Sequence, residues 1–165
     1  MTPITCFAGR RVALFGLGGS GLATARALIA GGAQVEAYDD NAASRDRAAG
    51  EGIAVVDLAA ADWSRFDSLI LAPGVPLTHP APHWTVEKAK AAGVEVIGDI
   101  ELFFRQRAAT EPAASVVCIT GTNGKSTTTA LIGHILKAAG KDVHVGGNIG
   151  IGVLDLPEMH AGSIY

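Results

Sequence analysis

Near the start of the chain, a short continuous run of hydrophobic residues is followed by hydrophobic residues at helical spacing. Residues 12–15 form a short apolar run that ends in glycines, and apolar residues then recur at helical spacing as far as Gly31 and Gly32. This pattern predicts a strand, a tight turn and a helix. The apolar positions that define the helix are Leu22, Ala25, Leu28 and Ile29.

The same alternation continues through the next seventy residues. Strands are predicted at residues 34–40, 53–56, 68–74 and 94–98. Helices are predicted at residues 41–50, 85–93 and 99–107. Either Asn41 or Ser44 can cap the first of these helices, because both side chains can accept from free N–H groups. Strands that alternate with helices favour a mainly parallel, doubly wound sheet.

A second unit begins after residues 108–114, whose small residues and proline predict a linker. There the pattern restarts with a strand at 115–120, a glycine turn, a helix at 125–139 and a strand at 142–145, and the last four residues resemble the opening of another strand. So short a unit cannot close a parallel sheet on both faces. We therefore expect the chain to be the N-terminal piece of a longer protein.

The composition narrows the class of protein. Hydrophobic residues make up 48% and charged residues 18%, which is typical of a globular chain with a core. The formal net charge is −3 without runs of like charge, so a nucleic-acid partner is not expected. Arg26 interrupts the apolar stretch after Arg10 and Arg11, which argues against a membrane span or export signal. Cys6 and Cys118 lie far apart, which favours a reducing cytoplasm, and Cys118 is expected to be buried in its strand.

The first glycine turn has the pattern G-x-G-x-x-G at Gly16, Gly18 and Gly21. In such a turn the first glycine allows the bend, the second lets a diphosphate approach the backbone, and the third lets helix and strand pack closely. Asp39 or Asp40, at the end of the second strand, stands where an acid would hold a ribose hydroxyl. A glycine turn that merely packs is the alternative.

The second glycine turn, "GTNGKS" at residues 121–126, lacks the full P-loop spacing because Ile119 stands where the first glycine should be. Its chemistry is nevertheless that of a phosphate site. Backbone N–H groups of residues 122–125 can surround a phosphate, Lys125 can reach the terminal phosphates, and Ser126 can hold Mg²⁺. A solvated loop with an incidental lysine is the alternative.

The remaining candidates are less specific. Prolines between His79 and His83 argue against a helical metal pair, so a surface loop is expected there. The other notable histidines, His134 and His144, are expected to be ordinary structural residues in a helix and a strand. The two tryptophans, Trp63 and Trp84, are expected to be packing anchors.

Two further residues lie in glycine-containing loops. Gly74 follows Pro73 at the carboxyl end of a predicted strand, where open α/β sheets bind ligands. Asn148 is flanked by glycines that leave its amide free to meet a ligand. A plain turn is the competing interpretation for both.

Five motifs in this order, "GLGGSG", "APGV", "GDIELF", "TGTNGKST" and "GGNIG", resemble the Mur ligase family of peptidoglycan synthesis, and within it the D-glutamate-adding members. The resemblance covers essentially the whole chain. It implies a Rossmann-like, doubly wound parallel-sheet domain over residues 1–110 that holds a UDP-sugar. The start of a P-loop-type, ATP-binding α/β central domain would follow over residues 111–165.

The resemblance also implies a reaction and its participants. ATP and Mg²⁺ would drive amide formation between UDP-N-acetylmuramoyl-L-alanine and D-glutamate through an acyl phosphate, in the cytoplasm and by a monomer, in support of cell-wall synthesis and cell division. Lys125 would be the catalytic residue and Ser126 the Mg²⁺ ligand. The 165 residues alone would be inactive, because further family residues lie beyond them.

Site residues carried over from the family fall into two groups. The implied ATP-binding residues are Gly121, Thr122, Asn123, Gly124, Lys125, Ser126 and Thr127. The implied UDP-sugar-binding residues are Gly18, Gly19 and Ser20 along the diphosphate, Asp39 and Asp40 near the uridine, Gly74 beside the uracil, and Asn148 against the diphosphate and sugar. Asn41 departs from the family, since some members have an arginine there.

Two other functions remain open on sequence grounds. An NAD(P)-dependent oxidoreductase or ligand-sensing domain would use the first glycine turn and Asp39 but would leave the second turn unexplained. A non-catalytic nucleotide-binding module would use both turns without a reaction.

Overall fold

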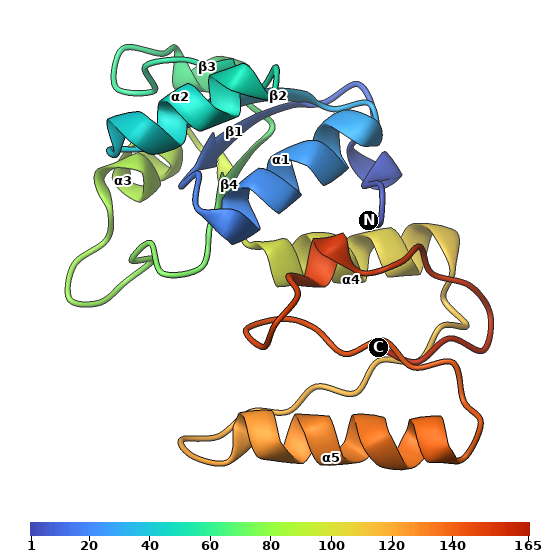
Figure 1. The fold of residues 1–165 in the computed structure, drawn as a ribbon. Coiled ribbons are helices and arrows are strands. Elements are labelled where there is room, and N and C mark those ends of the chain that lie inside the picture. Colours follow the sequence, from blue (N-terminus) through green and yellow to red (C-terminus); the bar gives the residue numbers. More distant parts are fainter.

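The computed structural model describes residues 1–165 and contains one sheet of five parallel strands in the order β3-β2-β1-β4-β5 (Figure 1). The strands are β1 (Arg11–Phe15), β2 (Gln34–Tyr38), β3 (Ala54–Val55), β4 (Ser68–Leu71) and β5 (Glu95–Ile97). The predicted doubly wound parallel sheet is therefore confirmed.

Five α-helices and three 3₁₀ turns connect the strands and continue the chain. The helices are α1 (Gly19–Ala30), α2 (Ala42–Gly50), α3 (Trp84–Ala91), α4 (Asp99–Thr110) and α5 (Lys125–Ala138), and the turns are η1 (Thr5–Phe7), η2 (Trp63–Arg65) and η3 (Val153–Asp155). Of the two candidate caps for α2, Asn41 is the one used, since its Oδ1 accepts from the N–H groups of Ala43 and Ser44.

The sheet divides the buried apolar residues into two clusters, because successive side chains of a strand point to opposite faces. Val12 and Leu14 of β1 pack with α1 and α2 on one face. Ala13 and Phe15 pack on the other face, with α3 and η2. Burial on both faces explains why β1 and β4 read as continuous apolar runs.

The direction of winding reverses between β1 and β4, which are neighbours at the centre of the sheet. After β1 the chain moves outward through β2 and β3, and it then crosses back to form β4 and β5 on the other side. In open α/β sheets such a reversal leaves a crevice at the carboxyl ends of the two strands. The first glycine turn and the segment Ala72–Val75 lie at this crevice.

Residues 111–165 form no comparable sheet. The strands expected at 115–120, 142–145 and the end of the chain are wrong, because only isolated bridges join Ser115 and Val143 to Ile164. Without strands on both sides, the 115–120 segment is not covered, and Cys118 is exposed instead of buried. The predicted helix α5 does form (Figure 1). Leu131 on this helix is 57% exposed.

Part of the second unit nevertheless completes the core of the first. Around η3, the buried side chains of Val153, Leu154 and Leu156 belong to the cluster that contains α1. The Thr2 hydroxyl donates to the carbonyls of Leu156 and Pro157, both at 3.0 Å. No helix combines the length and the apolar character that crossing a membrane requires.

Candidate functional site

The glycines of the β1–α1 turn have two different roles. Gly16 has φ +97°, and a Cβ there would lie 2.7 Å from the Cβ of Ala72. A Cβ on Gly21 would lie 1.8 Å from the carbonyl oxygen of Gly16, so α1 could not pack on the turn. A Cβ on Gly18 or Gly19 would meet no atom within 4 Å. Packing therefore explains Gly16 and Gly21, while Gly18 and Gly19 border open space that a ligand could fill.

The two acids after β2 differ in their surroundings. Asp39 accepts from the N–H of Leu17 at 2.5 Å and from the N–H of Asn41 at 2.8 Å, so its carboxylate ties the glycine turn to the end of β2. The Asp40 side chain is 71% exposed, and its Oδ2 lies 3.7 Å from Nε2 of His83. Asp39 thus supports the turn, and Asp40 offers the freer carboxylate.

His83 adds an aromatic feature to this end of the sheet that the sequence did not reveal. The residue caps α3, and its ring lies 4.2 Å from the ring of Phe15. His79 instead lies in the loop before α3, as expected, with its Nδ1 3.0 Å from the hydroxyl oxygen of Thr78. Trp84 packs edge-on against Phe15, consistent with its predicted packing role.

A cavity of about 750 Å³ opens at the crevice between the two units. Ser20 from the start of α1, Gly74 from the loop after β4, and Asn148 from the second unit line it together. The structure therefore brings three of the predicted sugar-nucleotide residues to one cavity. Gly18, Gly19, Asp39 and Asp40 are not among the residues that line it.

Asp99, the first residue of α4, lines the same cavity, although no site role was expected for it. Its Oδ1 accepts from the N–H of Ile100 at 2.9 Å, and burial raises the pKa of its carboxyl group. Its place in the "GDIELF" motif was the available signal. A carboxyl group with a raised pKa in a cavity wall is a candidate for substrate contact.

The second glycine turn has the donors of a phosphate site. Gly121 and Gly124 have φ +145° and +76°, which lets the chain bend sharply before α5 begins at Lys125. The N–H groups of residues 122–127 donate to no backbone carbonyl. Nζ of Lys125 donates to the carbonyls of Gly121 and Thr122, which holds the ammonium group over the turn. Donors at a helix N-terminus beside a lysine fit a polyphosphate.

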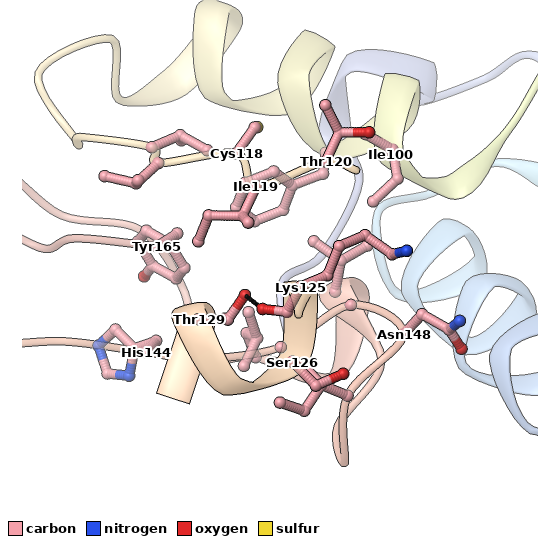
Figure 2. A pocket seen from close by; sticks show the side chains of 18 of the residues that line it. Ile100, Cys118, Ile119, Thr120, Lys125, Ser126, Thr129, His144, Asn148 and Tyr165 are labelled. Atoms are coloured by element: carbon pink, nitrogen blue, oxygen red, sulfur yellow. Dashed lines mark hydrogen bonds between the residues drawn. The ribbon is translucent and has the colours of Figure 1, made fainter. Parts of the chain in front are cut away.

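A second cavity, of about 510 Å³, lies beside this turn (Figure 2). Lys125, Ser126 and Thr129 from the start of α5 line it, and Asn148 lines it from the glycine-rich loop. The other predicted ATP-binding residues do not line this cavity. They are Gly121, Thr122, Asn123, Gly124 and Thr127.

The two cavities are adjacent because they share part of their walls. Ile100 from α4 and the pair Gly147 and Asn148 from the glycine-rich loop line both of them. A ligand held at the first glycine turn and one held at the second would therefore approach each other at Asn148. This arrangement suits transfer of a group between two bound molecules.

Family models match both units. The model described as Mur ligase MurD-like, N-terminal domain matches residues 10–98, and the model described as Mur ligase middle domain matches residues 119–160. Among solved structures, a shikimate dehydrogenase from Aquifex aeolicus aligns with 61% of this chain and 46% of its own, at 16% identity and a TM-score of 0.48.

Curated relatives align with the whole chain. The chain is 62% identical over 167 residues to a UDP-N-acetylmuramoylalanine–D-glutamate ligase of Caulobacter vibrioides, covering 100% of this chain and 36% of the relative. It is 63% identical over 165 residues to the ligase of the same name from Agrobacterium fabrum, covering 100% of this chain and 35% of the relative. The chain thus spans about a third of the length of these relatives. Because the N-terminal family model matches residues 10–98, the chain belongs to the Mur ligase family and has a MurD-like N-terminal domain.

Proposed function

We propose that this chain is part of an ATP-dependent ligase of peptidoglycan precursor synthesis that adds D-glutamate to UDP-N-acetylmuramoyl-L-alanine. The observation that carries the proposal is the wall shared by the two cavities at Ile100, Gly147 and Asn148. An activated carboxylate must form where the sugar-nucleotide substrate and the terminal phosphate of ATP meet, and a shared wall supports that geometry. The names of the relatives support the choice of substrates.

The first glycine turn would hold the UDP portion of the sugar nucleotide. Gly18 and Gly19 border open space, so a diphosphate can approach their backbone, and Ser20 continues this edge into the larger cavity. Gly74 would lie beside the uracil and Asn148 against the diphosphate and sugar. Asp40 is the better placed of the two acids to meet the uridine, because both carboxylate oxygens of Asp39 already accept backbone N–H groups.

The second glycine turn would hold ATP with Mg²⁺, and its residues fit both. The free N–H groups of residues 122–127 and the ammonium group of Lys125 are donors for phosphate oxygens. The Ser126 hydroxyl lines the cavity and is the oxygen ligand that Mg²⁺ would take from this turn. Bound Mg²⁺ supplies charge neutralisation at the phosphates, and Lys125 would orient and stabilise the same oxygens. The whole protein would act as a cytoplasmic monomer.

Calorimetric binding of UDP-N-acetylmuramoyl-L-alanine to the protein tests the proposal. We expect binding that UDP displaces and NAD does not. Replacement of Asn148 by Ala should weaken this binding, whereas Asn123→Ala serves as the matched control, because Asn123 lines neither cavity. Binding of NAD in competition with UDP would instead assign the first turn to a dinucleotide and overturn the proposal.

A second titration separates the two cavities. We expect Lys125→Ala to weaken binding of Mg²⁺-ATP and to leave the affinity for UDP-N-acetylmuramoyl-L-alanine unchanged, because Lys125 lines only the smaller cavity. Equal losses for both ligands would show that the two glycine turns do not serve different substrates.

A further inference from the structure

Three side chains of the second unit converge outside the two glycine turns. Ligand atoms of Asp142, His144 and His160 all lie within 4.8 Å of one another. Oδ2 of Asp142 is 3.0 Å from Nε2 of His144 and 2.8 Å from Nε2 of His160. Asp142 and His144 flank Val143, which pairs with Ile164, and side chains two apart on an extended segment point to the same side.

Backbone hydrogen bonds hold these three residues in place. The N–H of Ile164 donates to the carbonyl of Asp142, and the N–H of His144 donates to the carbonyl of Ile164, both at 2.9 Å. The turn that carries His160 is closed by Ser163, which is fully buried: its Oγ accepts from the N–H of His160 at 3.2 Å and donates to the carbonyl of His160 at 2.6 Å. Backbone hydrogen bonds therefore fix the segments that carry the three ligand side chains.

Each ring nitrogen of His160 lies next to an oxygen atom. Nδ1 of His160 lies 3.1 Å from the carbonyl oxygen of Ala161, while Nε2 faces the carboxylate oxygen of Asp142. A neutral imidazole has one N–H and can donate to only one of these acceptors. Donation from Nδ1 to a backbone carbonyl is the arrangement that directs the lone pair of Nε2 toward a metal. In that arrangement the Nε2 lone pair is available to a metal ion that Asp142 also binds.

We propose that Asp142, His144 and His160 bind a divalent transition-metal ion of the Zn²⁺ type, with the fourth position open. Ligands about 2.0–2.1 Å from a tetrahedral zinc lie roughly 3.3 Å apart, so the observed separations of 2.8 and 3.0 Å need to widen only slightly. Two imidazoles and one carboxylate suit Zn²⁺, Co²⁺ or Ni²⁺, whereas Mg²⁺ prefers oxygen ligands.

Such an ion would join two segments near the smaller cavity. It would clamp residues 142–144 to the turn at 160–163, and the imidazole of His144 also lines the cavity that contains Lys125. Figure 2 shows His144 and Asn148 on opposite sides of that cavity. The metal site would be separate from the Mg²⁺ site at Ser126, and it does not depend on the proposed ligase function.

Zinc titration of the untagged, chelator-treated protein tests the proposal, with a chromophoric chelator as competitor. We expect one Zn²⁺ per chain, with affinity at least about 100-fold weaker in His160→Gln, because loss of a ligand should cost no less than loss of an outer-shell partner. The His160 side chain is 60% exposed, so this variant should fold normally. His134→Gln is the matched control, because His134 is an exposed histidine on α5 that is not part of the cluster.

Two further readouts decide between a metal and a proton. Zn²⁺ should raise the melting temperature of the wild type and of His134→Gln but not of Asp142→Asn, since only a binding-competent native state is stabilised. Affinity should fall as the pH falls, because protons compete for the imidazoles. Equal Zn²⁺ affinity in His160→Gln and wild type, or an NMR spectrum in which His160 stays doubly protonated at saturating Zn²⁺, would overturn the proposal.

Discussion

The strand β4 and the segment at residues 115–120 have similarly apolar sequences but different structures. β4 pairs with β1 on one side and β5 on the other, and all four of its residues are buried. The 115–120 segment forms one isolated bridge, from Ser115 to Ile164, and Val117 within it is 47% exposed. An apolar run becomes a buried strand only when neighbouring strands satisfy its backbone and cover its faces.

A helix can form without neighbouring elements, as a comparison of α5 with α1 shows. Both begin at a glycine turn, and each satisfies its backbone internally. α1 buries seven of its residues against the sheet, whereas Gly133 is the one buried residue of α5. Gly133 marks a close approach, because a Cβ there would lie 2.6 Å from Cγ2 of Val145. Local signals therefore determine that α5 forms, and packing determines how much it contributes to stability.

The largest expected difference in the free energy of unfolding is between alanine variants of a leucine in the sheet and a leucine on α5. Leu69→Ala should lower the free energy of unfolding by about 2–5 kcal/mol, because Leu69 is fully buried in β4. Leu131→Ala should change it by less than about 0.5 kcal/mol, because Leu131 on α5 is exposed. Urea unfolding measures both. Similar losses would mean that α5 is packed in solution and that the contrast between the regions is wrong.

A smaller effect should separate the two kinds of glycine in the first turn. Gly21→Ala should destabilise the protein by about 1–3 kcal/mol, since its Cβ would overlap the carbonyl oxygen of Gly16. Gly19→Ala should leave the free energy of unfolding within about 0.5 kcal/mol of the wild type and should weaken binding of UDP. Urea unfolding and calorimetry test the pair, and the assignment fails if Gly19→Ala binds UDP normally.

The contribution of the helix N-terminus to stability should also differ between α2 and α5. Asn41→Ala should lower stability by about 1 kcal/mol, because the Asn41 side chain accepts from two N–H groups of α2. Ser126→Ala should change stability by less than about 0.5 kcal/mol, since no side chain caps α5, and it should weaken Mg²⁺-ATP binding. Thermal unfolding and ATP titration check both variants. A stability loss at Ser126 as large as that at Asn41 would contradict the assignment.

The smallest effect concerns an ion pair on the first unit. Hydrogen bonds from Arg105 hold the pKa of Glu95 below its ordinary value. Because this pKa is depressed in the folded state, the contribution to stability is present above the unfolded pKa and is lost as the pH falls through the folded pKa. Arg105→Gln should cost less than about 1 kcal/mol at pH 7, since almost half of the Glu95 side chain is exposed to solvent, which screens the pair.

A pH series of unfolding measurements tests the sign of this effect. The difference between the wild type and Arg105→Gln should shrink as the solution is acidified below the ordinary pKa of glutamate. A difference that grows with acidity would show that another group dominates. Asp99 acts in the opposite direction, because burial raises its pKa, but it is present in both proteins and so cancels in their difference.

The sequence predicted the first unit better than the second. The physical reason is that the elements of the first unit depend on local sequence signals, whereas those of the second depend on contacts with distant residues. The strands and helices of residues 11–110 follow from periods of two and 3.6, from glycine stops and from the Asn41 cap, all of which are local. The 115–120 and 142–145 segments carry the same local signal. These two segments do not form strands, because strand formation also requires pairing partners elsewhere in the chain.

The candidate site was predictable in part for a similar reason. Ser20, Gly74 and Asn148 were chosen from separate motifs, and the topology brings them to one cavity. The support that Asp39 gives to Leu17 could not be seen, because an acid at a strand end looks the same whether it meets a ligand or a backbone N–H. His144 was expected to be an ordinary structural residue. Asp142 is two residues away, and His160 is distant in sequence but not in space.

The hydrogen bonds from Thr2 to the carbonyls of Leu156 and Pro157 imply an order of folding steps during synthesis. Thr2 finds these partners only after more than 150 further residues have been made. All five strands are complete by residue 97, so the sheet can close while the chain is still growing. Thr2 is thus fixed only after the strands of the sheet have been made, and a nascent chain shorter than about 155 residues leaves the surface beneath α1 uncovered.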